Sequence, residues 1–447
     1  MSFQLTPEQL DIVNAPLVPL RVSAGAGTGK TTTIVLRLKA LISEGVAPET
    51  ALGITFTNKA AGELGDRLRT EFPDLTADGR EIQVTTYHGF AYRLLQEFGA
   101  LVQVERDTAV IGPAHQRQLL EEGLGSDTFA HLDLTYPSGV ISKAFTLAGQ
   151  IGDNLLDSAA VRDAAPTGDL LDDVWLTRLE LLSIVDSYAA AKERLRVVDY
   201  ADLVGRAHRL VTQHPAIAQR IQDRYRVVLL DEYQDTDPAQ RELLRAIFGG
   251  GFPITAVGDS DQTIYEWRGA SRLNFDGFVR HFAQGDGSEA ATLPLTLNRR
   301  SDRAILDLAN RIRAHLHGDE SFEPLRPGPD ADAGAIETGW LGTREEETAW
   351  IAEQIARVHD NGTPWNEIAV LVRKNRDIGP VREALLEAGI PSEVASVGGL
   401  LDVPEVAELL AWLRLLEDPG DTTSLARILL GSGYRLGLGD LAALSGV

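Results

Sequence analysis

A short segment near the N-terminus constrains the fold more than any other part of the chain. The run AGAGTGKTTT, residues 24–33, follows an apolar stretch at 17–22 and precedes a helical pattern of apolar residues that starts at Ile34. This order of strand, glycine-rich loop and helix is typical of a loop that binds nucleotide phosphates, because small residues let backbone N–H groups surround the phosphates at the start of a helix. The alternative is a glycine-rich connection in an α/β fold that binds no ligand.

The loop offers specific groups to a nucleoside triphosphate and its magnesium ion. Lys30 places a positive charge beside the β- and γ-phosphates, and the hydroxyl of Thr31 can bind Mg²⁺. One departure from the usual motif is Ala24, which replaces its first glycine. We expect the whole segment to bind nucleotide; its residues are Ala24, Gly25, Ala26, Gly27, Thr28, Gly29, Lys30, Thr31 and Thr32.

A pair of carboxylates further along the chain completes the expected site. The segment YRVVLLDEYQD, residues 225–235, has the pattern of a buried strand that ends at Asp231 and Glu232. Residues at the carboxyl end of a parallel strand face the crevice where ligands bind. Asp231 suits the Mg²⁺ shell, and Glu232 suits the base that orients the attacking water. Acidic residues also begin many loops after strands, but the upstream phosphate loop favours the catalytic interpretation.

Composition excludes several classes of site. The chain has 447 residues, a net charge of −23 and no cysteine, which excludes disulfides, thiolate zinc sites, iron–sulfur clusters and cysteine nucleophiles. The acidic balance argues against a broadly basic surface, so any polyanion must be bound through local patches or backbone amides. The N-terminus lacks the basic start and apolar core of a leader, and no apolar run approaches a membrane span, so we expect an intracellular protein without a membrane partner.

Alternating patterns predict an α/β fold with parallel sheets. Strands at ALGITF and EIQVTT, each followed by a helix, extend the phosphate-loop unit to about residue 100. The α/β pattern resumes with the strand before Asp231 and with PITAVGD, residues 253–259. Between them, residues 101–196 are mostly helical in pattern and more polar, as expected of an inserted helical domain.

A second alternation follows the strand-like TLPLTL. It consists of a strand at AIETGWL, a helix from Arg344 to about His359, a strand at EIAVLV and a helix to Gly389. The predicted domains are a first lobe (1–100 plus 197–292), a helical insertion (101–196), a partial second lobe (293–396) and the start of a helical fourth domain (397–447).

Ordered segments along nearly the whole chain resemble a known family. These segments are LTPEQ, AGAGTGKTTT, GITFTNKAAGELGDRL, VTTYHGFAYRLL, VDYADL, LLDEYQDTDPAQ, AVGDSDQTIYEWRGA and LTLNRRS. In this order they resemble the UvrD/Rep type of superfamily 1 DNA helicases. The resemblance implies two P-loop, RecA-like lobes that bind ATP with Mg²⁺ and hydrolyse it to move along single-stranded DNA, usually 3′ to 5′. It further implies action at junctions of single strand and duplex in DNA repair or recombination, repair proteins as partners, and a cytoplasmic, nucleoid-associated location.

The resemblance also implies roles for residues outside the phosphate loop. Gln9 matches the family's adenine-reading glutamine, whose amide can form paired hydrogen bonds with an adenine edge. Gln262 matches the residue that senses the γ-phosphate and the water, and Arg300 matches the arginine finger of the second lobe. Arg299 departs from the family, which usually has an aromatic residue there, although a guanidinium plane can also stack on adenine.

Aromatic and polar residues in the same segments predict a path for single-stranded DNA. Aromatic faces stack on any base and contribute about 1–3 kcal/mol each, which suits a protein that must pass over every sequence. Each aromatic residue could instead pack in the core; the motif positions favour DNA contact for Phe56 and Trp267, and Tyr87 stays open between the two. The expected DNA-binding residues are Phe56, Thr57, Asn58, Thr86, His88, Tyr265, Trp267 and Arg268.

Later segments of the family, including a second arginine finger, do not occur in the sequence. Either this is a piece of a longer helicase or the protein is naturally truncated. We expect the first, and we expect residues 1–447 alone to be deficient in turnover and unwinding. Two functional classes remain open: a DNA-translocating ATPase, with a RecB-like helicase–nuclease as a variant, and a non-enzymatic module that binds ATP and single-stranded DNA. The candidate catalytic residues Glu232, Gln262 and Arg300 favour hydrolysis.

Overall fold

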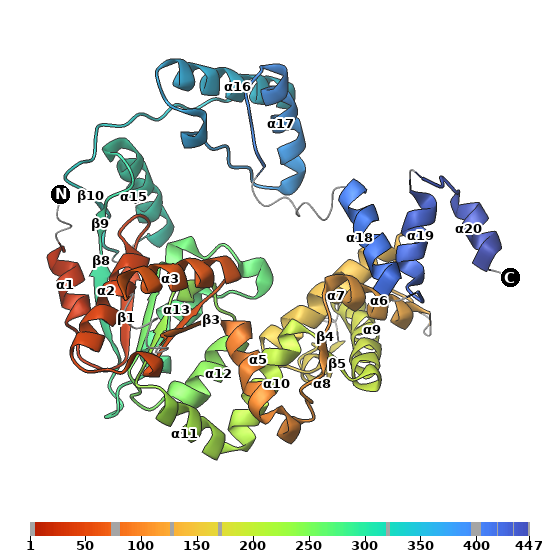
Figure 1. The fold of residues 1–447 in the computed structure, drawn as a ribbon, viewed down its shortest axis with the longest axis horizontal. Coiled ribbons are helices and arrows are strands. Elements are labelled where there is room, and N and C mark those ends of the chain that lie inside the picture. The colour runs from red at the N-terminus through yellow and green to blue at the C-terminus, as the bar shows by residue number, and fades with distance from the viewer. Residues whose placement is uncertain are drawn as a thin grey trace. The chain divides into compact units, whose positions relative to one another are not determined.

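The structure is a computed structural model that divides into two compact units, residues 1–336 and 337–447. Figure 1 follows the chain in colour from the N-terminus to the C-terminus. The described residues are 5–72, 81–125, 129–168, 172–318, 322–394, 404–417, 419–431 and 433–445.

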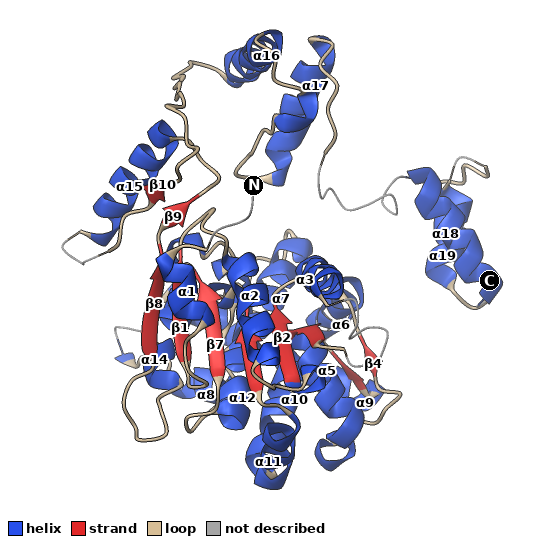
Figure 2. Ribbon diagram, turned by 60° about the vertical axis from the view of Figure 1, so that its left-hand side comes forward, coloured by secondary structure: helices blue, strands red, loops and turns tan. Residues whose placement is uncertain are grey.

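The described residues of the first unit form a parallel sheet of six strands in the order β3-β2-β6-β7-β1-β8. Strands β2, β6 and β7 are buried along their whole length, as expected at the centre of a parallel sheet covered on both faces (Figure 2). Because β6, β7 and β1 are neighbours, their carboxyl ends lie side by side. The strands are β1 (Leu20–Ala24), β2 (Ala51–Thr55), β3 (Gln83–Thr86), β6 (Val227–Leu230), β7 (Ile254–Gly258) and β8 (Ala291–Leu295).

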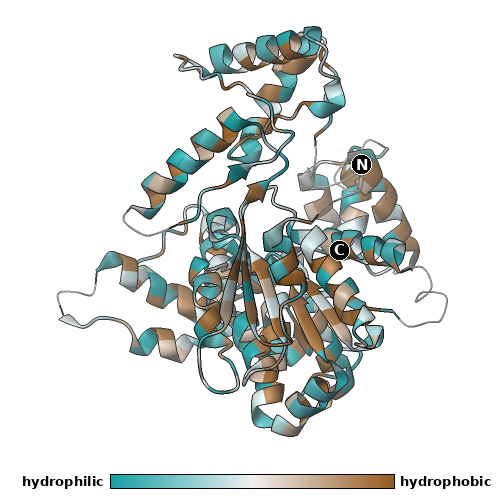
Figure 3. Ribbon diagram, turned by 90° about the vertical axis from the view of Figure 1, so that its left-hand side faces the viewer, coloured by the Kyte–Doolittle hydropathy of each residue, from teal (hydrophilic) through white to brown (hydrophobic). Residues whose placement is uncertain are grey.

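Helices cover both faces of this sheet, and alternate strand residues supply the two cores. In β6, Val228 and Leu230 belong to one hydrophobic cluster, whereas Val227 and Leu229 belong to another, as the two-residue period of a strand requires. The strands are accordingly among the most hydrophobic elements in Figure 3. The first cluster includes side chains of α5 (Tyr87–Phe98), α10 (Tyr200–Gln213), α11 (Pro215–Arg224), α12 (Pro238–Phe248) and α14 (Phe278–His281). The second includes side chains of α1 (Pro7–Val13), α2 (Lys30–Ser43) and α3 (Asn58–Glu71).

The segment between the two halves of the sheet is helical, as its sequence pattern predicts. Its helices α6, α7 and α9 share a hydrophobic cluster, and short strands β4 (Ala109–Val110) and β5 (Val197–Val198) pair beside it. Aspartates begin two of the helices, because Asp157 and Asp172 accept hydrogen bonds from the backbone of the first turn of α8 and α9. The helices are α6 (Pro113–Leu124), α7 (Pro137–Asp153), α8 (Ser158–Asp163) and α9 (Asp173–Leu195).

Strand β8 extends across the predicted boundary at residue 293. Strand β8 spans Ala291–Leu295 and pairs with β1, so it belongs to the sheet of the first lobe. The chain then passes through Thr296 into β9 (Leu297–Asn298), which pairs with β10 (Arg326–Pro327), and α15 (Arg303–His317) lies between these two strands in sequence. The strand pattern of TLPLTL predicts a strand, but it does not say which sheet that strand joins.

The second unit lacks the expected strands. Residues 335–341 and 368–372 form no strand, Glu367 ends the 3-10 helix η7 (Trp365–Glu367), and the described residues of 337–447 contain no strand. A strand needs a neighbour for its backbone N–H and C=O groups, and none is present there. Instead, Ile368 and Val370 pack against a cluster formed by α16 (Arg344–Asp360) and α17 (Ile378–Glu387).

The predicted helices of the second unit are present. Helix α16 begins with a capping box between Thr343 and Glu346. Among the described residues after α17 lie α18 (Pro404–Glu417), α19 (Thr422–Leu430) and α20 (Leu438–Ser445). None of the helices in the described part of the chain is both long and apolar enough to cross a membrane.

Candidate functional site

The glycine-rich loop joins the end of β1 at Ala24 to the start of α2 at Lys30. Gly27 and Gly29 have φ values of 67° and 85°, in the left-handed region that favours glycine. The Thr28 hydroxyl donates a hydrogen bond of 2.8 Å to the Gly25 carbonyl and closes the loop on itself. The loop therefore leads directly into the N-terminus of a 14-residue helix, which suits an anion.

Residues 298–300 pack on this loop. The Asn298 side chain donates a hydrogen bond of 2.6 Å to the Ala26 carbonyl, and the Arg299 backbone N–H donates one of 2.9 Å to the Gly27 carbonyl. A Cβ atom on Gly27 would lie 2.7 Å from the Cβ of Arg300, so only glycine allows this approach. The structure thus brings Arg299 and Arg300, both exposed, to the phosphate loop.

The carboxylates at the end of β6 face the start of α2. Nζ of Lys30 lies 3.3 Å from Oε2 of Glu232, close enough for an ion pair. This buried ammonium has no hydrogen-bond acceptor among the described residues, which is what a phosphate-binding lysine needs. Glu232 itself has φ 50° and ψ 42°, so its side chain leaves the strand in a direction that ordinary extended backbone would not give.

Asp231 is buried beside this pair. The pKa of Asp231 is raised to about 6, first by burial and then by the charge of Glu232, although Lys30 and hydrogen bonds from the Glu232 backbone and the Thr31 hydroxyl oppose the shift. Asp231 and Thr31 together fit Mg²⁺, which proteins hold in such sites through one or two oxygen ligands plus phosphate oxygens. No larger cluster of histidine and carboxylate ligands occurs among the described residues.

A chain of hydrogen bonds connects Glu232 to Gln262. The Gln234 amide donates a hydrogen bond of 2.8 Å to Oε2 of Glu232, and its oxygen accepts one of 3.2 Å from the Asp259 backbone N–H. Oδ2 of Asp259 accepts a hydrogen bond of 2.7 Å from the Gln262 amide. The structure therefore brings Gln262 to the same edge of the sheet as Glu232. Three of these site residues, Gln234, Asp259 and Asn298, were not predicted from the sequence, although their places at strand ends and beside motif residues were an available signal.

Gln9 lies against the other side of the phosphate loop. It is buried, its Nε2 atom lies 3.5 Å from the Thr33 hydroxyl, and a Cβ atom on Gly29 would lie 3.4 Å from it. Its Oε1 atom accepts a hydrogen bond of 3.0 Å from the Thr6 backbone N–H, as part of a capping box at the start of α1. Thr32, in the first turn of α2, is partly buried.

Aromatic side chains from two loops form a row at the carboxyl edge of the sheet. The rings of Phe56 and Tyr265 lie 4.7 Å apart, and those of Tyr265 and Trp267 lie 6.2 Å apart. The guanidinium of Arg268 lies 4.6 Å from the centre of the Trp267 ring. Trp267 is 70% exposed, so the end of this row is open to a flat ligand such as a base. We call Phe56, Tyr265 and Trp267 the aromatic row.

The remaining expected DNA residues have mixed environments. The hydroxyls of Thr57 and Thr86 cap α3 and α5 with hydrogen bonds of 3.0 Å, and Asn58 is exposed at the first position of α3. His88 packs edge-on against Tyr200, and burial and the Arg268 charge lower its pKa. Tyr87 is only 3% exposed in the hydrophobic core, which assigns it to packing.

Comparison with known proteins agrees with this arrangement of motifs. Residues 5–283 match the UvrD/REP helicase N-terminal domain, and residues 293–445 match the UvrD-like helicase C-terminal domain. The chain is 33% identical to the ATP-dependent DNA helicase UvrD1 of Mycobacterium tuberculosis, over 98% of this chain and 55% of that protein. It is 32% identical to UvrD2 of the same organism, over 97% of this chain and 61% of that protein. It is 29% identical to DNA helicase II of Escherichia coli, over 95% of this chain and 56% of that protein.

The chain thus spans between half and two thirds of the length of these curated relatives. Its phosphate loop, its carboxylate pair at the end of β6 and its six-stranded parallel sheet have the arrangement of a RecA-like lobe. With matches to both domains of the family along its length, the chain belongs to the UvrD/REP helicase family.

Proposed function

We propose that this protein is an ATP-dependent DNA helicase that moves along single-stranded DNA, 3′ to 5′, in DNA repair or recombination. One observation carries the proposal: Lys30, at the end of the glycine-rich loop, pairs with Glu232 at the carboxyl edge of the sheet, and the Cβ of Arg300 lies against Gly27 of the same loop. A lysine, a carboxylate and an arginine finger are the charges that phosphoryl transfer to water requires. The relatives' names, which specify ATP-dependent DNA helicases, support the same assignment.

Each residue has a separate task in this proposal. Lys30 and the N–H groups of the loop bind the phosphates, and Thr31 and Asp231 hold Mg²⁺, which neutralises phosphate charge when bound. Glu232 orients the attacking water and accepts its proton. Arg300 stabilises the charge that develops on the transferred phosphoryl group. Gln9 and Arg299 contact the adenine.

The loop after β7 supports coupling between hydrolysis and DNA. It carries Gln262, whose amide is fixed by Asp259, and then Tyr265 and Trp267 of the aromatic row. Bases that stack on this row would rest on the same short segment that holds Gln262. We infer that single-stranded DNA, alone or at a junction with duplex, stimulates hydrolysis through this loop, and that the protein works at the nucleoid with other repair proteins.

The test is ATP hydrolysis by the purified full-length protein with and without single-stranded DNA. We expect stimulation by DNA, loss of ATP binding in Lys30→Ala, and a kcat about 10²- to 10⁴-fold lower in Glu232→Gln, which still binds ATP. The matched controls are Lys39→Ala and Glu71→Gln, because this exposed pair, 2.8 Å apart, has the same chemistry on the outer surface of α2 and α3. Both controls should keep the parent rate.

Two outcomes would contradict the proposal. Binding of ATP and single-stranded DNA without any turnover would instead identify a non-enzymatic binding module. Unwinding of a 5′-tailed duplex in preference to a 3′-tailed one would reverse the assigned direction.

A further inference from the structure

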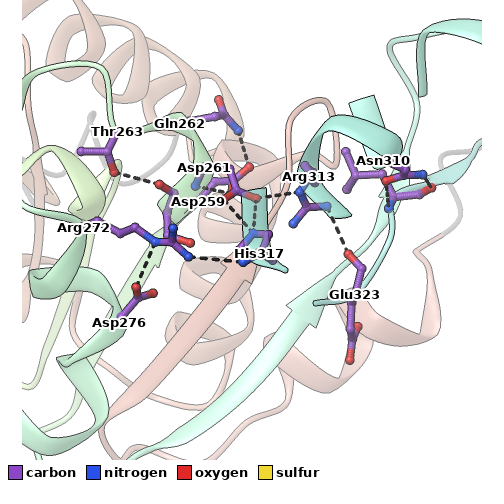
Figure 4. Close-up of polar contacts among 12 residues, drawn as sticks. Asp259, Asp261, Gln262, Thr263, Arg272, Asp276, Asn310, Arg313, His317 and Glu323 are labelled. Carbon is purple, nitrogen blue, oxygen red and sulfur yellow. Dashed lines mark hydrogen bonds and ion pairs between the residues drawn. The ribbon is translucent and has the colours of Figure 1, made fainter. Parts of the chain in front are cut away.

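Asp261, the residue before Gln262, pairs with two side chains of α15, a helix more than 40 residues later in the sequence. Nε of Arg313 lies 2.6 Å from its Oδ2, and Nε2 of His317 lies 3.0 Å from Oδ1 and 3.1 Å from Oδ2 (Figure 4). Arg313 and His317 are one turn apart on α15, so they reach the carboxylate from the same face of that helix. The three side chains are at most 18% exposed.

The protons in this cluster can be assigned from its donors. Nη2 of Arg272 lies 3.3 Å from Nδ1 of His317, and a guanidinium only donates, so Nδ1 accepts and the hydrogen on Nε2 faces Asp261. Arg272 also pairs with Asp276, and the Phe322 ring stacks on His317 at 5.3 Å. Burial alone would raise the pKa of Asp261, but the hydrogen bonds from Arg313 and His317 outweigh it, so the pKa is lowered and the carboxylate stays charged.

The same short turn fixes Gln262. Asp259 accepts hydrogen bonds from the Asp261 backbone N–H at 3.1 Å and from the Gln262 amide at 2.7 Å, through its two carboxylate oxygens. The Asp261 carboxylate and the Gln262 amide therefore belong to one rigid turn, η5 (Ser260–Gln262). A shift of α15 that moves Asp261 would also move Gln262.

Helix α15 is also anchored over the phosphate loop. It begins just after Arg300, whose Cβ approaches Gly27. The Asn310 side chain forms two hydrogen bonds of 2.9 Å with the backbone N–H and C=O of Leu325. The Leu325 side chain in turn lies against Gly25, where a Cβ atom added to the glycine would be 2.2 Å from it. A 15-residue helix is about 22 Å long and stiff. It thus connects the segment that carries Arg300 to the turn that carries Gln262.

We propose that Asp261 is a positioning residue for ATP hydrolysis, which acts through Arg313 and His317 to hold Gln262 and Arg300 in one rigid arrangement. This inference rests on the proposed function, because it assigns a task to residues beside the hydrolytic site. The contacts described for Asp261, Arg313 and His317 are with one another, with the turn of Gln262 and with Arg272, Glu323 and Phe322. Their effect should therefore appear in the rate of hydrolysis and leave nucleotide binding nearly unchanged.

The test compares kcat and KM for DNA-stimulated ATP hydrolysis in the full protein. Asp261→Asn keeps the size of the side chain and removes its charge, and we expect kcat to fall about tenfold with KM for ATP changed less than about twofold. Arg313→Ala should have a similar effect, Arg313→Lys should recover part of the loss, and Asp261→Asn combined with Arg313→Ala should be no worse than the stronger single change.

The matched control is Arg311→Ala, on the same helix. The Arg311 guanidinium contacts only its own helix at 3.4 Å, through the Asp307 carbonyl, in the contacts described, and it should keep the parent kcat. Parent kcat in both Asp261→Asn and Arg313→Ala would overturn the inference, as would additive losses in the double variant. If Asp261→Asn does not fold, as judged by its melting temperature, the kcat values of Arg313→Ala and Arg313→Lys test the inference in its place. An unaltered protein that hydrolyses no ATP would instead refute the proposed function.

Discussion

Lys30 and Glu232 form an ion pair across the carboxyl edge of the sheet, with Nζ 3.3 Å from Oε2. The lysine comes from the start of α2 and the glutamate from the end of β6, and strand β7 lies between β6 and β1. In the proposed function, a bound phosphate would share the Lys30 charge with Glu232. The carboxylate proposed to orient the attacking water would then weaken the binding of ATP.

Glu232→Gln should consequently bind ATP more tightly. The substitution releases the Lys30 charge and removes a negative charge near the phosphates, so we expect Kd to fall about three- to tenfold. Titration with a fluorescent ATP analogue and Mg²⁺ measures the change, and Glu71→Gln serves as the control. An unchanged or weaker affinity would show that the ion pair does not compete with phosphate.

Arg299 and Arg300 should separate nucleotide affinity from chemistry. Arg300→Ala is expected to bind ATP and to hydrolyse it about 10³-fold more slowly, because its charge acts on the transition state. Arg299→Ala is expected to weaken ATP binding with little change in kcat, because stacking on adenine contributes equally before and during the reaction. Single-turnover hydrolysis measures the rate and nucleotide titration measures the affinity of each variant. If Arg300→Ala mainly weakened binding and Arg299→Ala mainly slowed hydrolysis, the two assignments would be reversed.

Trp267→Ala should weaken the binding of single-stranded DNA without changing sequence preference. Loss of one stacking contact of about 1–3 kcal/mol corresponds to a roughly 5- to 150-fold higher Kd, similar for dT, dA and mixed oligonucleotides. Fluorescence anisotropy at fixed salt measures it. Trp340→Ala is the control, because Trp340 is fully exposed and lies outside the aromatic row. Tighter binding of the parent protein to blunt duplex than to single strands would contradict the predicted path.

Asp237→Asn should stabilise the protein at alkaline pH. Asp237 is a buried N-cap of α12, and burial, followed by the charge of Asp153, raises its pKa to about 8. The folded state then binds a proton that the unfolded chain, with an ordinary pKa near 3.9, has released, so this residue's contribution to stability falls as pH rises from about 4 to 8. Asparagine keeps the hydrogen bond from the Gln240 N–H and carries no charge.

Thermal unfolding between pH 6 and 9 tests this prediction. At pH 8 to 9 we expect Asp237→Asn to gain about 2 kcal/mol, with a flatter dependence on pH. Asp172→Asn is the control, because Asp172 is an N-cap on the exposed start of α9. A loss of stability in Asp237→Asn at pH 8 would mean that the charged form is the one the fold favours.

The sequence predicted the parts of the fold that depend on local pattern. The phosphate loop at 24–30, the strand before Asp231 and the helical insertion all form as expected, because apolar period and glycine placement are local signals. The strands at 335–341 and 367–372 have the same kind of pattern, yet strand formation also depends on a neighbour that the pattern does not specify. The same limit applies to β8, because its apolar pattern does not specify that it pairs with β1 in the first sheet.

The candidate site shows the same division. Motif position predicted DNA contact for Trp267, which is exposed, but it left Tyr87 open, and only packing places Tyr87 in the core. The cluster of Asp261, Arg313 and His317 joins residues more than 50 positions apart, which no local pattern can indicate.

Glu232 also has a consequence for the stability of the whole protein. Its left-handed backbone, at φ 50°, is strained for any residue with a side chain and costs about 1 kcal/mol, whereas glycine would adopt it freely. Selection for thermal stability alone would therefore favour glycine at this position. Under the proposed function, glutamate at this position trades a small amount of stability for catalysis, and a search for stabilising substitutions would select the residue proposed to orient the attacking water.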